Sequence, residues 1–212
     1  TAITKPLRIV VNKIEDIQNQ KFSHINYKPF TKELSFITQA VNRLSSSVEV
    51  MFKELTQKAE QFRIQAFEDS LTSVQNRNAF TRHMNALLSK TATSDEGYVI
   101  LIRLAQLNAI NMTLGAQDGD RYVTGVAEEL KNFSSSIQET LFLFRISGAD
   151  FVLVTEAMTK QECEAHLQVL NTTLSHYNPL KDGSKAVWIG AAQFNDQQSF
   201  SEIMENADSA LM

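Results

Sequence analysis

Side chains that commonly carry nucleophilic or metal chemistry are few in this sequence. A single cysteine, Cys163, leaves no partner for an internal disulfide and fits a reducing compartment. The four histidines show no metal-ligand spacing with that cysteine or with one another; they are His24, His83, His166 and His176. The sequence therefore predicts no metal site of histidine and cysteine, and no cofactor.

The other candidates for chemistry lie at a predicted tight turn. Two short apolar runs, 141–145 and 150–154, flank Ser147-Gly148-Ala149, and this pattern indicates a β-hairpin. A continuous apolar run at 98–104 is typical of a buried strand, and its one charged residue is Arg103 near the end. The hairpin and this strand are the elements that must position any site in this part of the chain.

The rest of the chain divides into an all-helical first part and an alternating second part. Residues 5–18 show apolar residues at helical spacing, and 19–31 break that pattern as a connector. A second helix is predicted from Thr31. From Asp69 onward, helices are predicted at 78–89, 118–132, 159–176 and 199–211, and a further strand at 185–192. The predicted fold class is α+β, an α/β sandwich around a mainly antiparallel sheet, preceded by an all-α region.

The second helix carries an unbroken heptad pattern. Its apolar positions follow one another in steps of three and four residues, which favours pairing in a left-handed coiled coil. These seam residues are Leu34, Ile37, Val41, Leu44, Val48, Met51 and Leu55. Because one copy leaves such a stripe exposed, we expect a homodimer; packing of the stripe on the chain's own domain is the alternative.

Composition limits the possible partners and environment. The net charge of the 212 residues is −4, so a nucleic-acid surface has no electrostatic support. No apolar run reaches the length of about 18 residues that a membrane span requires. The chain begins at Thr1, within a predicted helix, so we expect a piece of a longer protein.

The second part of the chain resembles GGDEF domains, the fold of diguanylate cyclases. Five blocks match in the family's order and spacing. The first two are Asp69-Ser70-Leu71-Thr72 with Asn76-Arg77 and Phe80, and Ile110-Asn111 with Gly115 and Gly119-Asp120. The others are Arg145-Ile146-Ser147-Gly148-Ala149-Asp150-Phe151, Ile189-Gly190-Ala191-Ala192, and Ala207-Asp208 with Ala210-Leu211.

The resemblance implies a site that has lost its ligands. The cyclases bind Mg²⁺ through a strand-end Asp, where this chain has Arg103, and through the third turn residue, which is Ala149 here. Met112 replaces the base-reading Asp, and Ser147 replaces a turn glycine. Residues that match the family pattern are Asn111, Gly148, Asp150 and Phe151. The resemblance therefore leads to the expectation that the chain is not an enzyme and binds neither metal nor nucleotide. Arg103 is either a surface or ion-paired arginine, or a permanent cation that fills the vacated metal site.

Residues 1–47 are similar to a HAMP module, 48–68 to a signalling helix, and 69–212 to a degenerate GGDEF domain. The stretch from Leu101 to Asn108, together with that from Arg145 to Phe151, resembles LapD-type cyclic-di-GMP receptors of the bacterial inner membrane, which implies a relay on the cytoplasmic side of that membrane. In such receptors an EAL domain, outside this chain, binds cyclic-di-GMP. The full-length protein binds a periplasmic LapG-type protease, which controls adhesion and biofilm formation. Diguanylate cyclases are further possible partners. Alternatives are a cyclase with displaced ligands and a CsrD-type RNA-decay adaptor.

Overall fold

The computed structural model describes residues 4–27, 30–89, 97–137, 140–177, 179–195 and 198–211. The chain forms two compact units, Thr1–Arg63 and Ile64–Met212. Within the described residues, no helix is both long enough and apolar enough to cross a bilayer. The domain boundaries inferred from the sequence, 1–47, 48–68 and 69–212, stay predictions.

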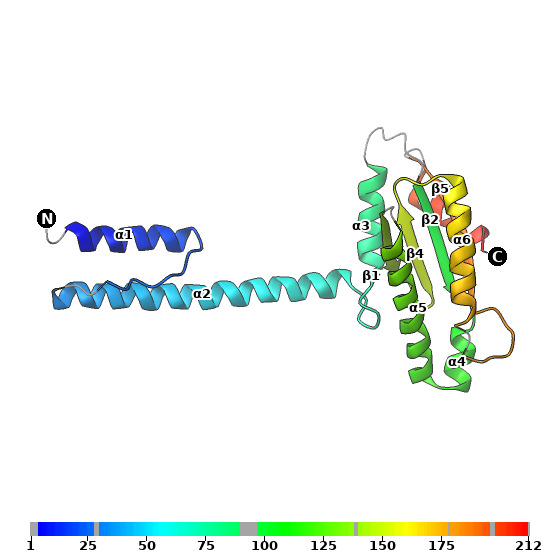
Figure 1. Cartoon of the computed structure of the whole chain (residues 1–212), viewed down its shortest axis with the longest axis horizontal. Coiled ribbons are helices and arrows are strands. Elements are labelled where there is room, and N and C mark those ends of the chain that lie inside the picture. Colours follow the sequence, from blue (N-terminus) through cyan, green and yellow to red (C-terminus); the bar gives the residue numbers. More distant parts are fainter. Residues whose placement is uncertain are drawn as a thin grey trace. The chain divides into compact units, whose positions relative to one another are not determined.

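The first unit contains α1 (Thr4–Gln18) and most of α2 (Lys32–Phe67), which lie side by side (Figure 1). The connector between them is bonded to α2: the Asn42 amide donates to the Ile25 carbonyl at 3.1 Å and accepts from its N–H at 2.8 Å. Ser45, fully buried, donates to the Phe22 carbonyl, and the Phe22 ring lies 6.0 Å from that of Phe52. These contacts hold the connector on one face of α2.

The second unit is built on a five-stranded sheet of order β1-β3-β4-β2-β5. The strands are β1 (Gln75–Asn76), β2 (Gly97–Leu104), β3 (Leu141–Arg145), β4 (Asp150–Thr155) and β5 (Val187–Phe194). Only the two-residue β1 pairs in parallel, with β3, and the other pairings are antiparallel. The helical region followed by an α+β domain with a mainly antiparallel sheet confirms the predicted fold class.

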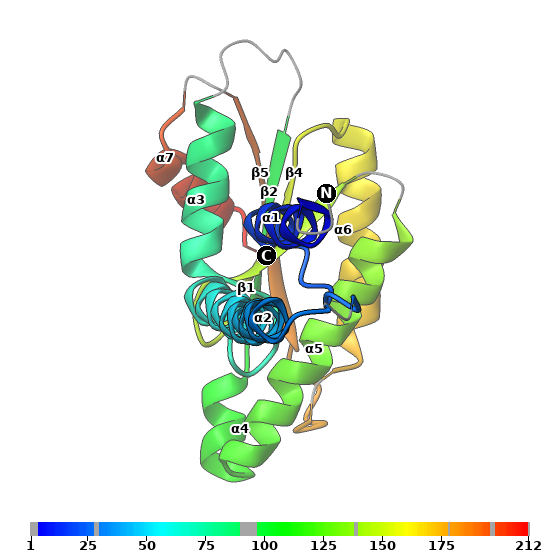
Figure 2. The same cartoon turned by 90° about the vertical axis from the view of Figure 1, so that its left-hand side faces the viewer.

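Helices cover both faces of this sheet (Figure 2). One face packs against α5 (Ala116–Ser136) and α6 (Lys160–Ser175), the other against α3 (Arg77–Leu88) and α7 (Phe200–Ser209). Because β2 is buried on both faces, its side chains from Val99 to Ile102 are at most 1% exposed. Gly190 of β5 allows α7 to approach: a Cβ there would lie 2.4 Å from the Ala207 carbonyl oxygen.

Local sequence signals fix the ends of three helices. The Asn76 side chain accepts from two N–H groups at the start of α3, and Thr159 with Glu162 and Ser199 with Glu202 form capping boxes. The sequence did not predict β1 or the short α4 (Leu107–Thr113). The last strand also begins two residues later, and ends two residues later, than predicted.

Candidate functional site

Residues 146–149 connect β3 to β4 and are called the signature turn here. This turn is closed by the Ser147 hydroxyl. Its oxygen accepts from the N–H groups of Ala149 at 3.2 Å and Asp150 at 3.1 Å, and the hydroxyl donates to Oδ2 of Asp150 at 2.9 Å. The Ile146 N–H donates to the Asp150 carbonyl at 2.9 Å. Gly148 has open space where a Cβ would lie. The serine in place of glycine therefore organises this turn through its side chain.

Arg103 lies beside this turn and bridges two carboxylates. Its Nε donates to Oδ1 of Asp150 at 2.7 Å, and its Nη2 lies 2.8 Å from Oδ1 of Asp208 on α7. The β2–β4 register places Arg103 directly opposite Asp150. The hydrogen bond that Arg103 donates to Asp150 is the largest cause that raises the pKa of Arg103, so the guanidinium stays charged. The ion-paired interpretation of Arg103 therefore describes its contacts.

The same end of the sheet holds an exposed aromatic ring. Trp188 of β5 is the cross-strand neighbour of Arg103, and the Lys185 ammonium lies 4.2 Å from the centre of its ring. Next to Arg103, a pocket of about 430 Å³ opens between the sheet and α7. Its lining residues are Leu101, Arg103, Ile146, Met204, Glu205, Asp208 and Ser209.

Arg145 connects the turn to the start of the domain. Its Nη1 donates to Oδ1 of Asp69 at 2.7 Å and its Nη2 to the Gly148 carbonyl at 2.8 Å. Thr72 donates to the same Asp69 oxygen through its N–H at 2.9 Å and its hydroxyl at 2.7 Å. Burial raises the pKa of Asp69, but the hydrogen bonds from Thr72 and Arg145 outweigh burial and lower it overall.

The predicted base-reading residues lie elsewhere in the domain. Asn111 and Met112 are on α4, both exposed, with Met112 88% accessible. Asn111 packs against Gly119, where a Cβ would lie 1.8 Å from its Oδ1. No hydrogen bond or ion pair among the described residues joins Asn111 or Met112 to Arg103 or Asp150.

The side chains at the turn do not fit the Mg²⁺ ion that the resemblance to cyclases implies. Hard cations need several free oxygen ligands. Ala149 offers none in its side chain, and the carboxylates of Asp150 and Asp208 both bind Arg103. Across the described parts of the chain, no group of three or more His, Cys, Asp or Glu residues could hold a metal ion. Cys163 is buried, and burial raises the pKa of its thiol to about 11.

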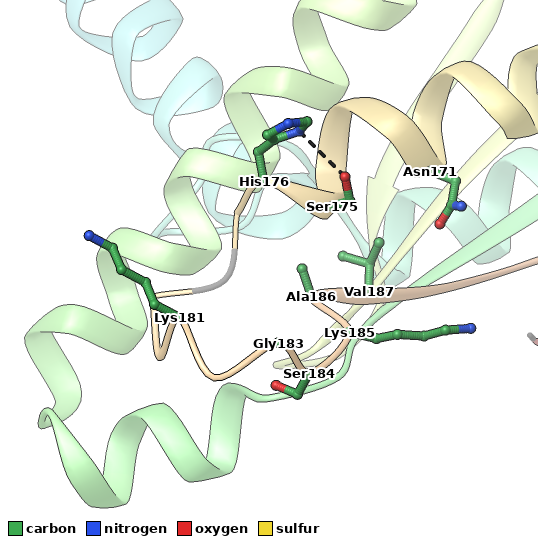
Figure 3. A pocket seen from close by; sticks show the side chains of 9 residues that line it. All are labelled: Asn171, Ser175, His176, Lys181, Gly183, Ser184, Lys185, Ala186 and Val187. Carbon is green, nitrogen blue, oxygen red and sulfur yellow. Dashed lines mark hydrogen bonds between the residues drawn. The ribbon is translucent and has the colours of Figure 1, made fainter.

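A second pocket, also of about 430 Å³, lies between the end of α6 and the start of β5 (Figure 3). Figure 3 shows the side chains of Lys181 and Lys185 extending in opposite directions, with His176 near Ser175 on another side. The cations therefore do not converge on one point. The signature turn, where charged groups from three elements meet, is the stronger candidate site.

Three features of this site could not be predicted from the sequence. Asp208 was noted only as part of a matching block, and its position on α7 beside Arg103 requires the tertiary fold. The pair of Asp69 and Arg145 joins residues 76 positions apart. Trp188 stood in a predicted strand, but its place next to Arg103 depends on the strand order.

Residues 66–212 match the family described as diguanylate cyclase, GGDEF domain, and the chain belongs to that family. It is 25% identical over 218 residues to the biofilm architecture maintenance protein MbaA of Vibrio cholerae, covering 99% of this chain and 27% of MbaA. It is 24% identical over 212 residues to diguanylate cyclase DgcN of Escherichia coli, covering 97% of this chain and 51% of DgcN. The chain thus spans about a quarter to a half of these relatives.

Solved structures share the fold. The coiled coil and GGDEF domain of DgcB from Caulobacter crescentus, in complex with c-di-GMP, superposes with a TM-score of 0.68 at 22% identity, covering 79% of this chain and 90% of that one. The S helix-GGDEF-EAL portion of Vibrio cholerae LapD, bound to c-di-GMP, gives 0.65 at 24% identity, covering 76% and 37%. Together with the family match, these structures show that the second unit has the GGDEF fold.

These relatives correct one expectation. The substitutions at Arg103, Met112 and Ala149 led to the prediction that the chain is not an enzyme. That prediction is contradicted by the relatives named diguanylate cyclases, which include DgcN and further proteins of Escherichia coli. Individual ligand positions do not suffice to decide activity, because a reaction can draw on groups that a motif does not include.

Proposed function

We propose that this chain is the relay portion of a LapD-type cyclic-di-GMP receptor. In this proposal an anchor in the inner membrane precedes a HAMP-like module at residues 1–47, and an EAL domain beyond the chain binds cyclic-di-GMP. The nucleotide state passes through α2 towards a periplasmic output that binds a LapG-type protease and so controls adhesion and biofilm formation. The chain itself supplies the helix and the GGDEF domain that join input to output.

One observation carries this proposal. Helix α2 ends two residues before Asp69, and the carboxylate of Asp69 binds Arg145, which in turn binds the signature turn. Helix α2 runs without interruption from Lys32 to Phe67. Asp69 follows, and its bond to Arg145 continues through Gly148 into the turn. Because both side chains are largely buried, at 24% and 10% exposure, the ion pair is only weakly screened by solvent. A displacement of the turn therefore has a direct route to the end of α2.

A second copy of the chain is the partner that the first unit needs. Of the seam residues, Ile37, Leu44, Met51 and Leu55 are between 43% and 64% exposed, while Leu34, Val41 and Val48 are half-buried. Leu7, Val11 and Ile14 form a second apolar stripe on α1, each 44% to 49% exposed. Two parallel stripes left uncovered on one helix pair fit a bundle formed by two copies. We therefore propose a homodimer through the first unit and the signalling helix.

Cysteine cross-linking in the full-length protein tests the relay. Within these 212 residues the only cysteine, Cys163, is buried, so Leu55→Cys places the single accessible thiol on the seam once any cysteines elsewhere in the full-length protein are replaced by serine. We expect a disulfide between two copies, with a yield that changes when cyclic-di-GMP is added. Asp69→Asn should abolish that change without abolishing the disulfide. Lys53→Cys, on the opposite face of α2, is the matched control and should give little disulfide. A disulfide yield of Leu55→Cys that does not change when cyclic-di-GMP is added would contradict the relay.

A second candidate function is the synthesis of cyclic-di-GMP. The named relatives favour it, and Asp150 and Asn111 keep the side-chain types of the family pattern. Incubation of the 212-residue chain with GTP and either Mg²⁺ or Mn²⁺, followed by chromatography, measures it directly. Product that disappears in Asp150→Asn would establish this function. Absence of product from a chain shown to be dimeric would remove it.

A further inference from the structure

We infer that the Arg103 guanidinium is a built-in cation that occupies the place of a divalent metal ion between the signature turn and α7. The inference concerns the electrostatics of this site and does not depend on the relay proposed above. The side chains at this position do not fit the metal ion that the resemblance to cyclases implies.

The geometry gives Arg103 the contacts that a bound cation would make. One nitrogen reaches Asp150 at 2.7 Å and another reaches Asp208 at 2.8 Å, so one cation joins carboxylates from β4 and α7. The second oxygen of Asp150 is held by the Ser147 hydroxyl at 2.9 Å. A planar guanidinium can serve two carboxylates at fixed angles, which a lysine ammonium does less well.

Burial does not prevent a metal ion from reaching this position. The side chains of Arg103 and Asp208 are 39% and 55% exposed, and the adjacent pocket is open to solvent. Asp150, at 18%, is the more buried partner. A dissolved cation can therefore reach the carboxylates, and the fixed positive charge already between them is what opposes its binding.

The charge at position 103 should therefore decide whether a metal ion can bind beside Asp150 and Asp208. Replacing Arg103 with Asp removes the internal cation and adds a third carboxylate to Asp150 and Asp208. Three carboxylates without a cation repel one another, and oxygen ligands of this kind suit Mg²⁺ and Mn²⁺. The variant should therefore be less stable than the native chain and should recover stability when either ion is added.

The chain carries its own reporter for this site. Trp188 is the only tryptophan, and it lies directly opposite Arg103 in the β2–β5 register. Its ring is 38% exposed, so its fluorescence responds both to unfolding and to a paramagnetic ion nearby. Quenching by Mn²⁺ at concentrations where Mg²⁺ competes would locate the ion beside this residue.

The experiment compares the native 212-residue chain with three variants by urea unfolding and Mn²⁺ titration, both followed through Trp188. For Arg103→Asp we expect saturable quenching. At a Mn²⁺ concentration about a hundred times its dissociation constant, the unfolding equilibrium constant should fall about a hundredfold. The native chain should show neither effect, and Arg103→Leu, which removes the cation but adds no oxygen ligand, should bind Mn²⁺ more weakly than Arg103→Asp. Arg121→Asp makes the same charge change at an exposed ion pair with Asp118 and should leave Trp188 unquenched.

Two results would overturn the inference. Saturable quenching in the native chain would show that a metal displaces Arg103, and a folded Arg103→Asp variant without any Mn²⁺ response would show that the carboxylates do not form a cation site. If Arg103→Asp stays unfolded at every Mn²⁺ concentration, Arg103→Asn decides, because it removes the cation with less repulsion. Saturable quenching in that variant supports the inference, and none overturns it.

Discussion

The ion pair between Asp69 and Arg145 should be a main source of stability in the second unit. Arg145 is only 10% exposed and has two described acceptors, Asp69 and the Gly148 carbonyl, while its Nε is buried without a described partner. The change Asp69→Asn keeps an oxygen for the bonds from Thr72 and Arg145 but removes the charge. It therefore isolates the electrostatic part of the interaction.

The expected loss is about 2–3 kcal/mol in the free energy of unfolding. Breaking a fully buried pair by removing one partner costs about 3–5 kcal/mol, and a hydrogen bond to a charged group contributes about 1.5–3 kcal/mol. Asp69 is 24% exposed, and the amide can still accept, so the effect should lie below the buried-pair range. Asp118→Asn, at an exposed pair with Arg121, is the control and should change stability by less than about 0.5 kcal/mol.

The effect should also depend on pH in a defined direction. The pKa of Asp69 in the folded protein is below its ordinary value of 3.8, so its carboxylate stabilises the fold fully above that value. This stabilisation is lost as the pH falls through the lowered folded-state pKa. The difference between the native chain and Asp69→Asn should therefore be constant near neutral pH and shrink below about pH 4.

Urea unfolding followed by Trp188 fluorescence measures both quantities, because this tryptophan reports only on the second unit. The native chain, Asp69→Asn and Asp118→Asn are compared at neutral pH and at about pH 3, with the denaturant slope checked for constancy. A loss at neutral pH no larger than that of the control would refute the reasoning. So would a loss that stays the same at both pH values.

Three further predictions follow from packing. Replacing both Val48 and Leu55 with Asp places charge in the proposed seam and should convert a dimer to a monomer in sedimentation; an unchanged mass would mean that the stripe packs elsewhere. Gly190→Ala should destabilise the domain by about 1–3 kcal/mol in thermal unfolding, because its Cβ would lie 2.4 Å from a carbonyl oxygen of α7. The control is Gly148→Ala, whose Cβ would meet no atom within 4 Å and which should leave the stability nearly unchanged. Because burial raises its thiol pKa to about 11, Cys163 should resist alkylation at about pH 8 until urea unfolds the chain, and rapid native labelling would contradict this.

The sequence predicted the elements of this fold better than their arrangement. Apolar runs identified β2 and the hairpin of β3 and β4, because four or more apolar residues in succession leave a clear pattern. The two-residue β1 and the seven-residue α4 are too short to show a period. Strand order is not contained in local patterns, so the position of Arg103 between Asp150 and Trp188 could not be predicted.

Two of the departures from the family pattern, Ser147 and Arg103, meet at the same carboxylate. Ser147 uses a hydroxyl that glycine lacks to bond Ala149, Asp150 and the carboxylate of Asp150. That carboxylate in turn binds Arg103, the residue that replaces a strand-end Asp. The two substituted residues therefore bond the two oxygens of one carboxylate, that of Asp150.

These contacts matter because a buried charge without a partner lowers the stability of the fold. The Arg103 guanidinium forms one ion pair with Asp150 and a second one with Asp208 of α7. The turn is thereby bonded to β2 and α7 on one side, and through Arg145 to Asp69 on the other. The same residues that alter the signature thus make its turn the point where the start of the domain, the sheet and the last helix are held together.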